Sequence, residues 1–268
     1  MLNYEKRGIP IALVKNNNEL NHKDNQIIYF CDNPDETKIK HPYETIDTDS
    51  PNEKIQYIPN VQTERSVIYI CGRSGCGKSY YSKEYIECYH MIFPKNPVYV
   101  FSYLDKDPTL DSMEYIKRVK IFEDGFLDAE FEISDFDKSL VLFDDCDCIK
   151  DKKLRKKIDS IMAKVLQVGR HHNVSCLCLS HQICNGSETK LQLNESNSIV
   201  LFPKGMGVRT LNYVLENYIG MSRKQVMTVK KLKSRSVTII KSSPMVIVSD
   251  KKIYVLKDPD EDDHTSTT

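Results

Sequence analysis

Gly77, Lys78 and Ser79 follow Gly72 after four intervening residues, which gives the pattern G-x-x-x-x-G-K-S. Glycines let backbone N–H groups approach phosphate oxygens, a lysine ammonium reaches the β and γ phosphates, and a serine hydroxyl can ligate Mg²⁺. The pattern therefore predicts a phosphate-binding loop for ATP. The residues predicted to hold the nucleotide are Gly72, Arg73, Ser74, Gly75, Cys76, Gly77, Lys78, Ser79 and Tyr80.

A second pattern is an apolar run followed by two acids. Residues 140–143 read LVLF, and Asp144 and Asp145 come directly after them. A central strand would deliver these carboxylates to the edge of the sheet where the phosphate loop lies. We expect Asp144 to hold Mg²⁺ together with Ser79, and Asp145 to orient or deprotonate the attacking water. Asp147 is a less favoured substitute for either acid.

Polar residues also surround a third apolar run. The expected strand at residues 176–179 ends before His181 and Gln182, and either side chain is placed to sense the γ-phosphate. Arg170, before this strand, is the candidate for a charge-stabilising arginine, within its own subunit or toward a neighbour's nucleotide. The alternative is that Arg170 is a capping residue and the others are ordinary loop residues.

The elements that must position these residues alternate between strand and helix. Residues 67–71 and 98–102 are apolar, β-branched runs typical of buried strands. Tyr81, Tyr85 and Tyr89 recur every four residues after Ser79, which predicts a helix. The alternation predicts an α/β fold, a three-layer phosphate-loop NTPase with a mostly parallel central sheet.

The rest of the chain has a different character. Residues 1–62 are predicted to be a partly extended N-terminal arm, because they are rich in Asn, Asp and Pro and contain one apolar run at 27–30. Residues 63–257 form the expected ATPase domain. From about residue 236 this domain becomes a β-rich C-terminal extension, with three short strands in a meander. Residues 258–268 are predicted to be an acidic, disordered tail.

Composition limits the classes of function. The chain has 268 residues, 40% of them hydrophobic and 28% charged, with a formal net charge of zero. Overall charge therefore gives no indication of nucleic-acid binding, and any DNA contact must come from local patches. Residues 150–157 hold six bases and one acid, and residues 223–241 hold seven bases and no acid. Each stretch is interpreted either as a solvated surface or as a contact with DNA phosphates.

The lack of long apolar runs and the pattern of cysteines indicate in which cell compartment the protein is expected. No apolar run approaches the length of a membrane span and no signal peptide precedes the chain, so we expect a soluble intracellular protein. The nine cysteines are odd in number and scattered, which favours reduced thiols. The Cys146/Cys148 and Cys176/Cys178 pairs lack the two-residue gap of zinc knuckles, and we favour packing over metal binding.

The blocks GRSGCGKS, LVLFDD and GRHHNVSCLCLSHQ together resemble the DNA-packaging ATPases of poxviruses and other large nucleocytoplasmic DNA viruses. That family is related to the FtsK–HerA translocases, and the similarity covers residues 64–256. The resemblance implies a ring of subunits, a hexamer or pentamer, that uses ATP and Mg²⁺ to drive viral double-stranded DNA into the capsid. It also implies a location in the virion and the host-cell cytoplasm, with capsid or internal-membrane proteins as further partners.

The sequence departs from this family at two positions. The family carries a glutamine sensor where an ungapped alignment from Arg170 places His181, with Gln182 one residue later. Many translocases have Asp-Glu where this chain has Asp144-Asp145. Two other functions share the phosphate loop: a kinase of small molecules, and an assembly switch that binds ATP without moving DNA.

Overall fold

The computed structural model describes residues 1–16, 26–33, 38–62 and 65–256. By their contacts these residues form two compact units, residues 63–199 and residues 1–62 with 200–268. The two units are described separately below. The proposed division into an arm, an ATPase domain and a tail stays a prediction, and the tail at 258–268 lies outside the described residues.

The unit of residues 63–199 is built on a parallel sheet. Its strands lie in the order β6-β10-β9-β7-β8, and each neighbouring pair is parallel. Their bounds are β6 Val67–Cys71, β7 Val98–Ser102, β8 Ile116–Arg118, β9 Leu140–Asp144 and β10 Ser175–Ser180. The predicted α/β class with a mostly parallel sheet is confirmed.

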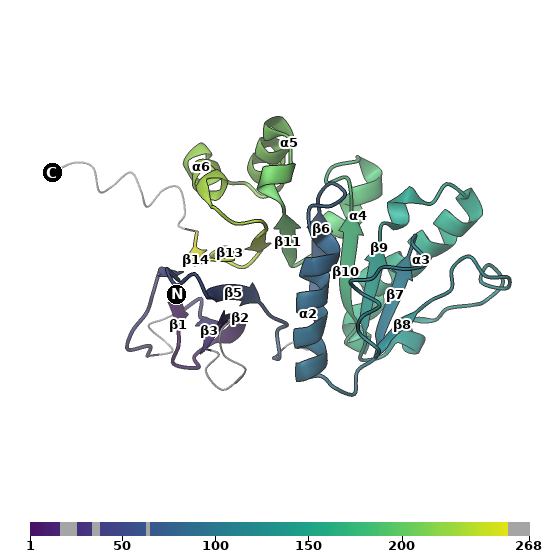
Figure 1. Ribbon diagram of the computed structural model, residues 1–268, viewed down its shortest axis with the longest axis horizontal. Helices are drawn as coiled ribbons and strands as arrows, with labels where there is room; N and C mark the ends of the chain where they lie inside the picture. The colour runs from purple at the N-terminus through teal and green to yellow at the C-terminus, as the bar shows by residue number, and fades with distance from the viewer. Residues whose placement is uncertain (17–25, 34–37, 63–64, 257–268) are drawn as a thin grey trace. The chain divides into compact units, whose positions relative to one another are not determined.

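Helices cover both faces of this sheet. They are α2 Lys78–Ile92, α3 Lys152–Val168 and α4 Ser187–Glu195, with short 3₁₀ turns η2 Ile133–Phe136, η3 Cys146–Cys148 and η4 Gly169–His172. The crossover from β6 to β7 runs one way along the sheet and the crossover from β9 to β10 runs back. Because such crossovers are right-handed, α2 and α3 lie on opposite faces. In Figure 1, α2 lies in front of the strands and α4 behind them.

The core lies in the central strands, whose residues are buried along their whole length. Every residue of β6, β9 and β10 is buried, as expected for a parallel sheet covered on both faces. Cys176 and Cys178 belong to this core, with their sulfur atoms 3.6 Å apart. The hydrogen bond with the Cys176 thiol and burial raise the pKa of Cys178. Both cysteines are buried and pack as small apolar side chains.

The other unit contains mainly antiparallel strands. One sheet has the order β1-β3-β2-β5, and a second group pairs β4, β14, β13 and β12 in that order. The bounds are β1 Leu2–Asn3, β2 Ile9–Asn16, β3 Gln26–Phe30, β4 Thr45–Asp47, β5 Glu53–Tyr57, β12 Val237–Ile240, β13 Val246–Ser249 and β14 Lys252–Val255. The meander at the C-terminus was predicted, whereas β1, β2, β4 and β5 were not.

The remaining elements connect these strands. Strand β11 Ser198–Leu201 lies at the boundary of the two units, followed by the turn η5 Pro203–Gly205, the helix α5 Val208–Tyr213, the π-helical turn η6 Val214–Tyr218 and the helix α6 Arg223–Lys231. Among the described residues, none of the helices combines the length and apolar character needed to cross a bilayer.

Candidate active site

The predicted phosphate loop lies between β6 and α2. Strand β6 ends at Cys71 and α2 begins at Lys78, so the loop occupies the carboxyl edge of the parallel sheet. Gly75 and Gly77 have φ angles of 72° and 113°, a region that L side chains rarely adopt. The Gly72 N–H donates to the carbonyl of Ser180 at 3.2 Å, which ties the loop to the end of β10. The local fold is that of an anion-binding loop before a helix.

Lys78 is the centre of a cluster of polar groups. Its side chain is buried, and its Nζ donates to the Gly72 carbonyl at 3.1 Å. The same Nζ lies 3.3 Å from Asp145 Oδ1 and 3.3 Å from His181 Nδ1. Three segments that are far apart in the sequence therefore converge on one ammonium group. The parallel sheet causes this convergence, because the carboxyl ends of β6, β9 and β10 share one edge.

The contacts of His181 define its tautomer. Lys78 Nζ can only donate, so Nδ1 must accept, and Nε2–H then donates to Asp145 Oδ2 at 2.9 Å. In this arrangement the ring uses one acceptor and one donor. A glutamine side-chain amide offers the same pair of functions. Of the two adjacent candidates, the side chain of His181 reaches Lys78 and Asp145, and Gln182 is exposed.

Asp144 lies beside this cluster and is almost fully buried, with 2% exposure. Ser102, at the end of β7, donates its hydroxyl to Asp144 Oδ2 at 2.8 Å. Burial raises the pKa of Asp144 to about 6; the charge of Asp145 adds to this, and the Ser102 hydrogen bond opposes it. Two adjacent carboxylates, Asp144 and Asp145, lie on the edge of the sheet where α2 begins and carries Ser79. Oxygen donors of this kind fit a hard divalent cation such as Mg²⁺.

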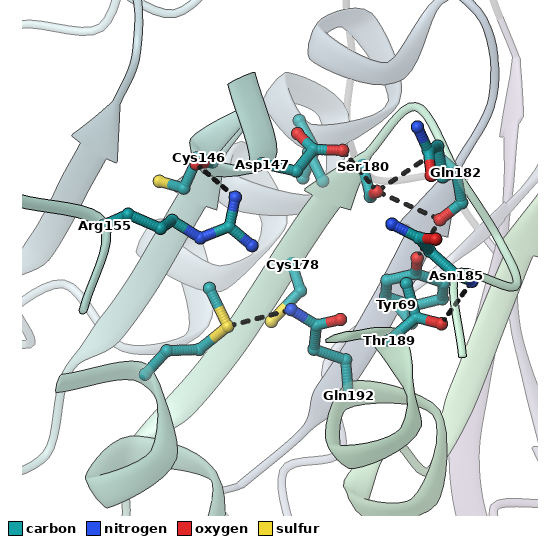
Figure 2. A pocket seen from close by; sticks show the side chains of 12 residues that line it. Tyr69, Cys146, Asp147, Arg155, Cys178, Ser180, Gln182, Asn185, Thr189 and Gln192 are labelled. Carbon is teal, nitrogen blue, oxygen red and sulfur yellow. Dashed lines mark hydrogen bonds between the residues drawn. The ribbon is translucent and has the colours of Figure 1, made fainter. Parts of the chain in front are cut away.

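Asp147, the less favoured substitute for the acid pair, contacts the end of β10. Its Oδ2 accepts from the Ser180 hydroxyl at 2.8 Å and from the His181 N–H at 3.3 Å. The Ser180 hydroxyl oxygen also lies 3.0 Å from the Gln182 carbonyl oxygen. Asp147 therefore holds the end of β10 against η3, as Figure 2 shows. It contacts the backbone of His181 and does not substitute for either acid of the pair.

A small cavity of about 50 Å³ adjoins this hydrogen-bonded end of β10. Figure 2 shows its polar lining, which comes from β6, η3, α3, β10, α4 and the segment between β10 and α4. Gln182 lines this cavity with Asp147 and Arg155, whereas Lys78 and His181 are absent from the described residues that surround it. Its volume suffices for ordered water only. We therefore assign nucleotide binding to the phosphate loop and not to this cavity.

Arg170 lies at the opposite edge of the sheet. It is an exposed residue of η4, which precedes the first residue of β10. The length of β10 separates it from the phosphate loop, roughly 17 Å at about 3.3 Å per residue. Parallel strands place their amino ends at the edge away from the loop, so this position does not favour contact between Arg170 and the nucleotide of its own subunit. The role of Arg170 toward a neighbour's nucleotide stays a prediction.

Three contributors to this edge were missed in the sequence analysis: Ser102, Ser180 and Tyr69. Ser102 and Ser180 are the last residues of their strands, so a polar residue that closes an apolar run was the available signal. The Tyr69 hydroxyl donates to the Gln182 carbonyl at 2.5 Å. No signal marked Tyr69, since it lies in the middle of an apolar run.

Comparison with known proteins gives one close relative. The chain is 42% identical over 200 residues to the uncharacterized protein V3 of Sputnik virophage, which covers 74% of this chain and 79% of that protein. No family model matches the chain.

Among solved structures, EssC (ATPases 2 and 3) from Geobacillus thermodenitrificans matches with a TM-score of 0.51 and 11% identity, over 80% of this chain and 44% of that one. The genome packaging NTPase B204 from Sulfolobus turreted icosahedral virus 2 matches with a TM-score of 0.49 and 16% identity, over 69% of this chain and 96% of that one. At such low identity the EssC match shows the fold alone, and it agrees with the α/β architecture described above.

Proposed function

Since this chain belongs to the same family as protein V3 of Sputnik virophage, we propose that it is a viral ATPase that drives double-stranded DNA into the capsid. The observation that carries the proposal is the convergence of Lys78, Asp145 and His181 at the phosphate loop. The sequence blocks that resemble DNA-packaging ATPases contain these three residues. The resemblance thus includes all three residues that contact one another, and it is not limited to the phosphate loop, which many ATPases share.

The proposed roles follow from position and chemistry. The loop from Gly72 to Tyr80 cradles the phosphates of ATP, with Lys78 on the β and γ phosphates. Ser79 and Asp144 hold Mg²⁺, which supplies charge neutralisation at the phosphates when it is bound. Asp145 lies beside Lys78 and accepts a hydrogen bond from His181, so it is placed to orient the attacking water and take its proton.

His181 is the proposed γ-phosphate sensor. It contacts both the lysine that reaches the phosphates and the acid that positions water. When a phosphate replaces Asp145 as the partner of Lys78, the imidazole must change at least one of its two hydrogen bonds. The backbone of His181 is fixed by Asp147, so this change is passed to the end of β10. Gln182 retains a supporting position through its carbonyl group.

The exposed position of Arg170 supports an assembly in which it reaches the nucleotide of the next subunit. A ring of such subunits, hexameric or pentameric, would surround the DNA. We place the protein in the virion and the host-cell cytoplasm, with capsid or internal-membrane proteins as further partners. Hydrolysis would be completed by a neighbouring copy, so turnover would depend on assembly.

The test is ATP turnover by the purified protein with and without double-stranded DNA, with Lys78→Ala as the control for contaminating ATPases. We expect turnover that DNA increases and that Lys78→Ala abolishes. Phosphate transfer that requires a small-molecule acceptor would instead identify a kinase. Tight ATP binding with no turnover under any condition would identify an assembly switch, and either result would overturn the proposal.

A further inference from the structure

The basic run at the start of α3 is divided by the structure into two sets of residues. One set is used by the fold itself. Arg155 pairs with Asp159 at 2.9 Å and donates to the Cys146 carbonyl at 3.1 Å. Lys157 donates to the carbonyls of Leu127 and Ala129, and its ammonium also lies near the rings of Phe126 and Phe131. These two side chains stabilise the unit and are not available to a partner.

The other set has no such role. Lys150, Lys152, Lys153 and Lys156 are exposed, and within the described chain they make no ion pair or hydrogen bond through their side chains. The acids nearest in sequence are already engaged. Asp151 caps the helix by accepting from the Leu154 N–H at 2.8 Å, and Asp159 pairs with Arg155. Among the residues that the structure describes, none of the four ammonium groups therefore has an ion-pair partner.

Their position is unfavourable for the helix. The first turn of α3 contains no acid, and cations near a helix N-terminus oppose the positive end of the helix dipole. Helix stability thus gives no reason for this cluster. A partner that carries negative charge does give one, since it would neutralise the lysines and the helix end together.

The cluster is also close to the hydrolytic acids along the chain. Strand β9 ends at Asp144, and α3 begins at Lys152 after the short turn η3. The lysines therefore stand on the same edge of the sheet as the phosphate loop. Lys153 and Lys156 also line a groove of about 540 Å³, in which four lysines face two glutamates. One of these, Glu132, lies 3.3 Å from Lys164.

We propose that Lys150, Lys152, Lys153 and Lys156 form a contact surface for the phosphate backbone of double-stranded DNA. This inference rests on the proposed packaging function and assigns its DNA contact to one face. Lysines recognise backbone phosphates as point charges and read no sequence, which suits a motor that must accept every base pair. The turn η3 links this surface directly to Asp145, so a change at the nucleotide would move the DNA contact.

The experiment compares the wild-type protein with two triple variants of equal charge change. One is Lys152→Gln/Lys153→Gln/Lys156→Gln, and the control is Lys95→Gln/Lys106→Gln/Lys190→Gln, whose lysines are exposed and scattered over the same unit. Binding to a random-sequence duplex is measured over a series of salt concentrations, together with ATP turnover without DNA. Melting curves verify that each variant is folded.

We expect the slope of log affinity against log salt concentration to become less steep in the α3 variant. The change should be about 0.9 per phosphate contact, or about 2.7 for the three lysines. Its affinity near 0.1 M salt should fall on the order of a hundredfold. Turnover without DNA should stay unchanged while stimulation by DNA is lost. The control should keep the wild-type slope.

Three outcomes would overturn the inference. The α3 variant would keep the wild-type slope, or both triples would lose the same amount, or the α3 variant would lose turnover without DNA along with its affinity. In these cases the wild-type protein still binds DNA and the packaging function survives. If the wild-type protein neither binds duplex DNA nor responds to it, the packaging proposal itself fails.

Discussion

The two edges of the parallel sheet in residues 63–199 carry functional groups in opposite ways. At the carboxyl edge, Lys78, Asp145 and His181 contact one another, and Asp144 lies beside them with a hydrogen bond from Ser102. Lys78 and Asp144 are buried. At the amino edge, Arg65 donates to the carbonyls of Val174, Val165 and Leu166. Arg170, on the same edge, is exposed.

The two edges differ in whether one subunit can bring the groups for hydrolysis together by itself. The carboxyl edge assembles from a single chain, because parallel strands bring their carboxyl ends together. The amino edge separates a structural arginine from a solvent-facing one. In the proposed mechanism Arg170 acts on a nucleotide bound to another copy, so we expect binding to be a property of one subunit and turnover a property of the assembly.

Among substitutions at the amino edge, we expect replacement of Arg170 to lower ATP turnover the most. We expect Arg170→Ala to bind ATP normally but to hydrolyse it about a thousandfold more slowly, because an arginine that stabilises the transferred phosphate contributes at least this much. The measurement is turnover at saturating ATP beside equilibrium binding of a fluorescent ATP analogue.

A mixing experiment then separates action across subunits from a local defect. Lys78→Ala subunits lack a working loop but keep Arg170, so mixing them with Arg170→Ala subunits should restore part of the turnover. No recovery in mixed rings of verified composition would contradict the action of Arg170 on a neighbouring site.

Substitutions at His181 sharpen the description of the carboxyl edge. His181→Ala removes both the acceptor and the donor that the ring provides to Lys78 and Asp145, and we expect turnover to fall about a hundredfold. His181→Gln keeps one acceptor and one donor and should lie within a few-fold of wild type. Gln182→Ala is the matched control and should change turnover little. If Gln182→Ala has the greater effect, the sensor has been assigned to the wrong residue.

A third prediction concerns the stability of the nucleotide-free protein. The pKa of Asp144 is raised from 3.8 to about 6, so the folded chain binds this proton more tightly than the unfolded chain does. The stability that Asp144 provides at low pH is therefore lost as pH rises through about 6, by about 3 kcal/mol. Asp144→Asn cannot ionise, so it should match wild type near about pH 4 and be more stable by about 3 kcal/mol near about pH 8.

Urea unfolding across this pH range, without nucleotide or Mg²⁺, measures the difference. Asp128→Asn, which changes an exposed acid of the same unit for which the described residues show no ion pair, is the control for general charge effects. A stability difference between Asp144→Asn and wild type that does not vary with pH would show that Asp144 is ionised without cost in the folded chain.

The sequence predicted much of this edge because its signals are local. The runs at residues 67–71 and 98–102 are strands with the predicted bounds. Strands buried on both faces are continuous apolar runs, which are easy to recognise. The loop glycines lie within one short segment, and the two acids at 144–145 are adjacent. Each motif could therefore be recognised in the sequence without knowledge of the sheet.

The features that were not predicted depend on pairing between distant residues. Strands β1, β4 and β5 are short or polar, and their partners lie elsewhere in the chain. The choice between His181 and Gln182 depended on how the backbone turns after β10, which Asp147 and Ser180 fix. The edge on which Arg170 lies followed only from the direction of the strand after it.

The most direct test of the account is a crystal structure with Mg²⁺ and a non-hydrolysable ATP analogue. We expect the triphosphate in the loop of residues 72–80, with Lys78 Nζ moved from Asp145 to the γ-phosphate and Mg²⁺ beside Ser79 and Asp144. A triphosphate bound elsewhere, or Lys78 still paired with Asp145 while nucleotide is bound, would contradict it.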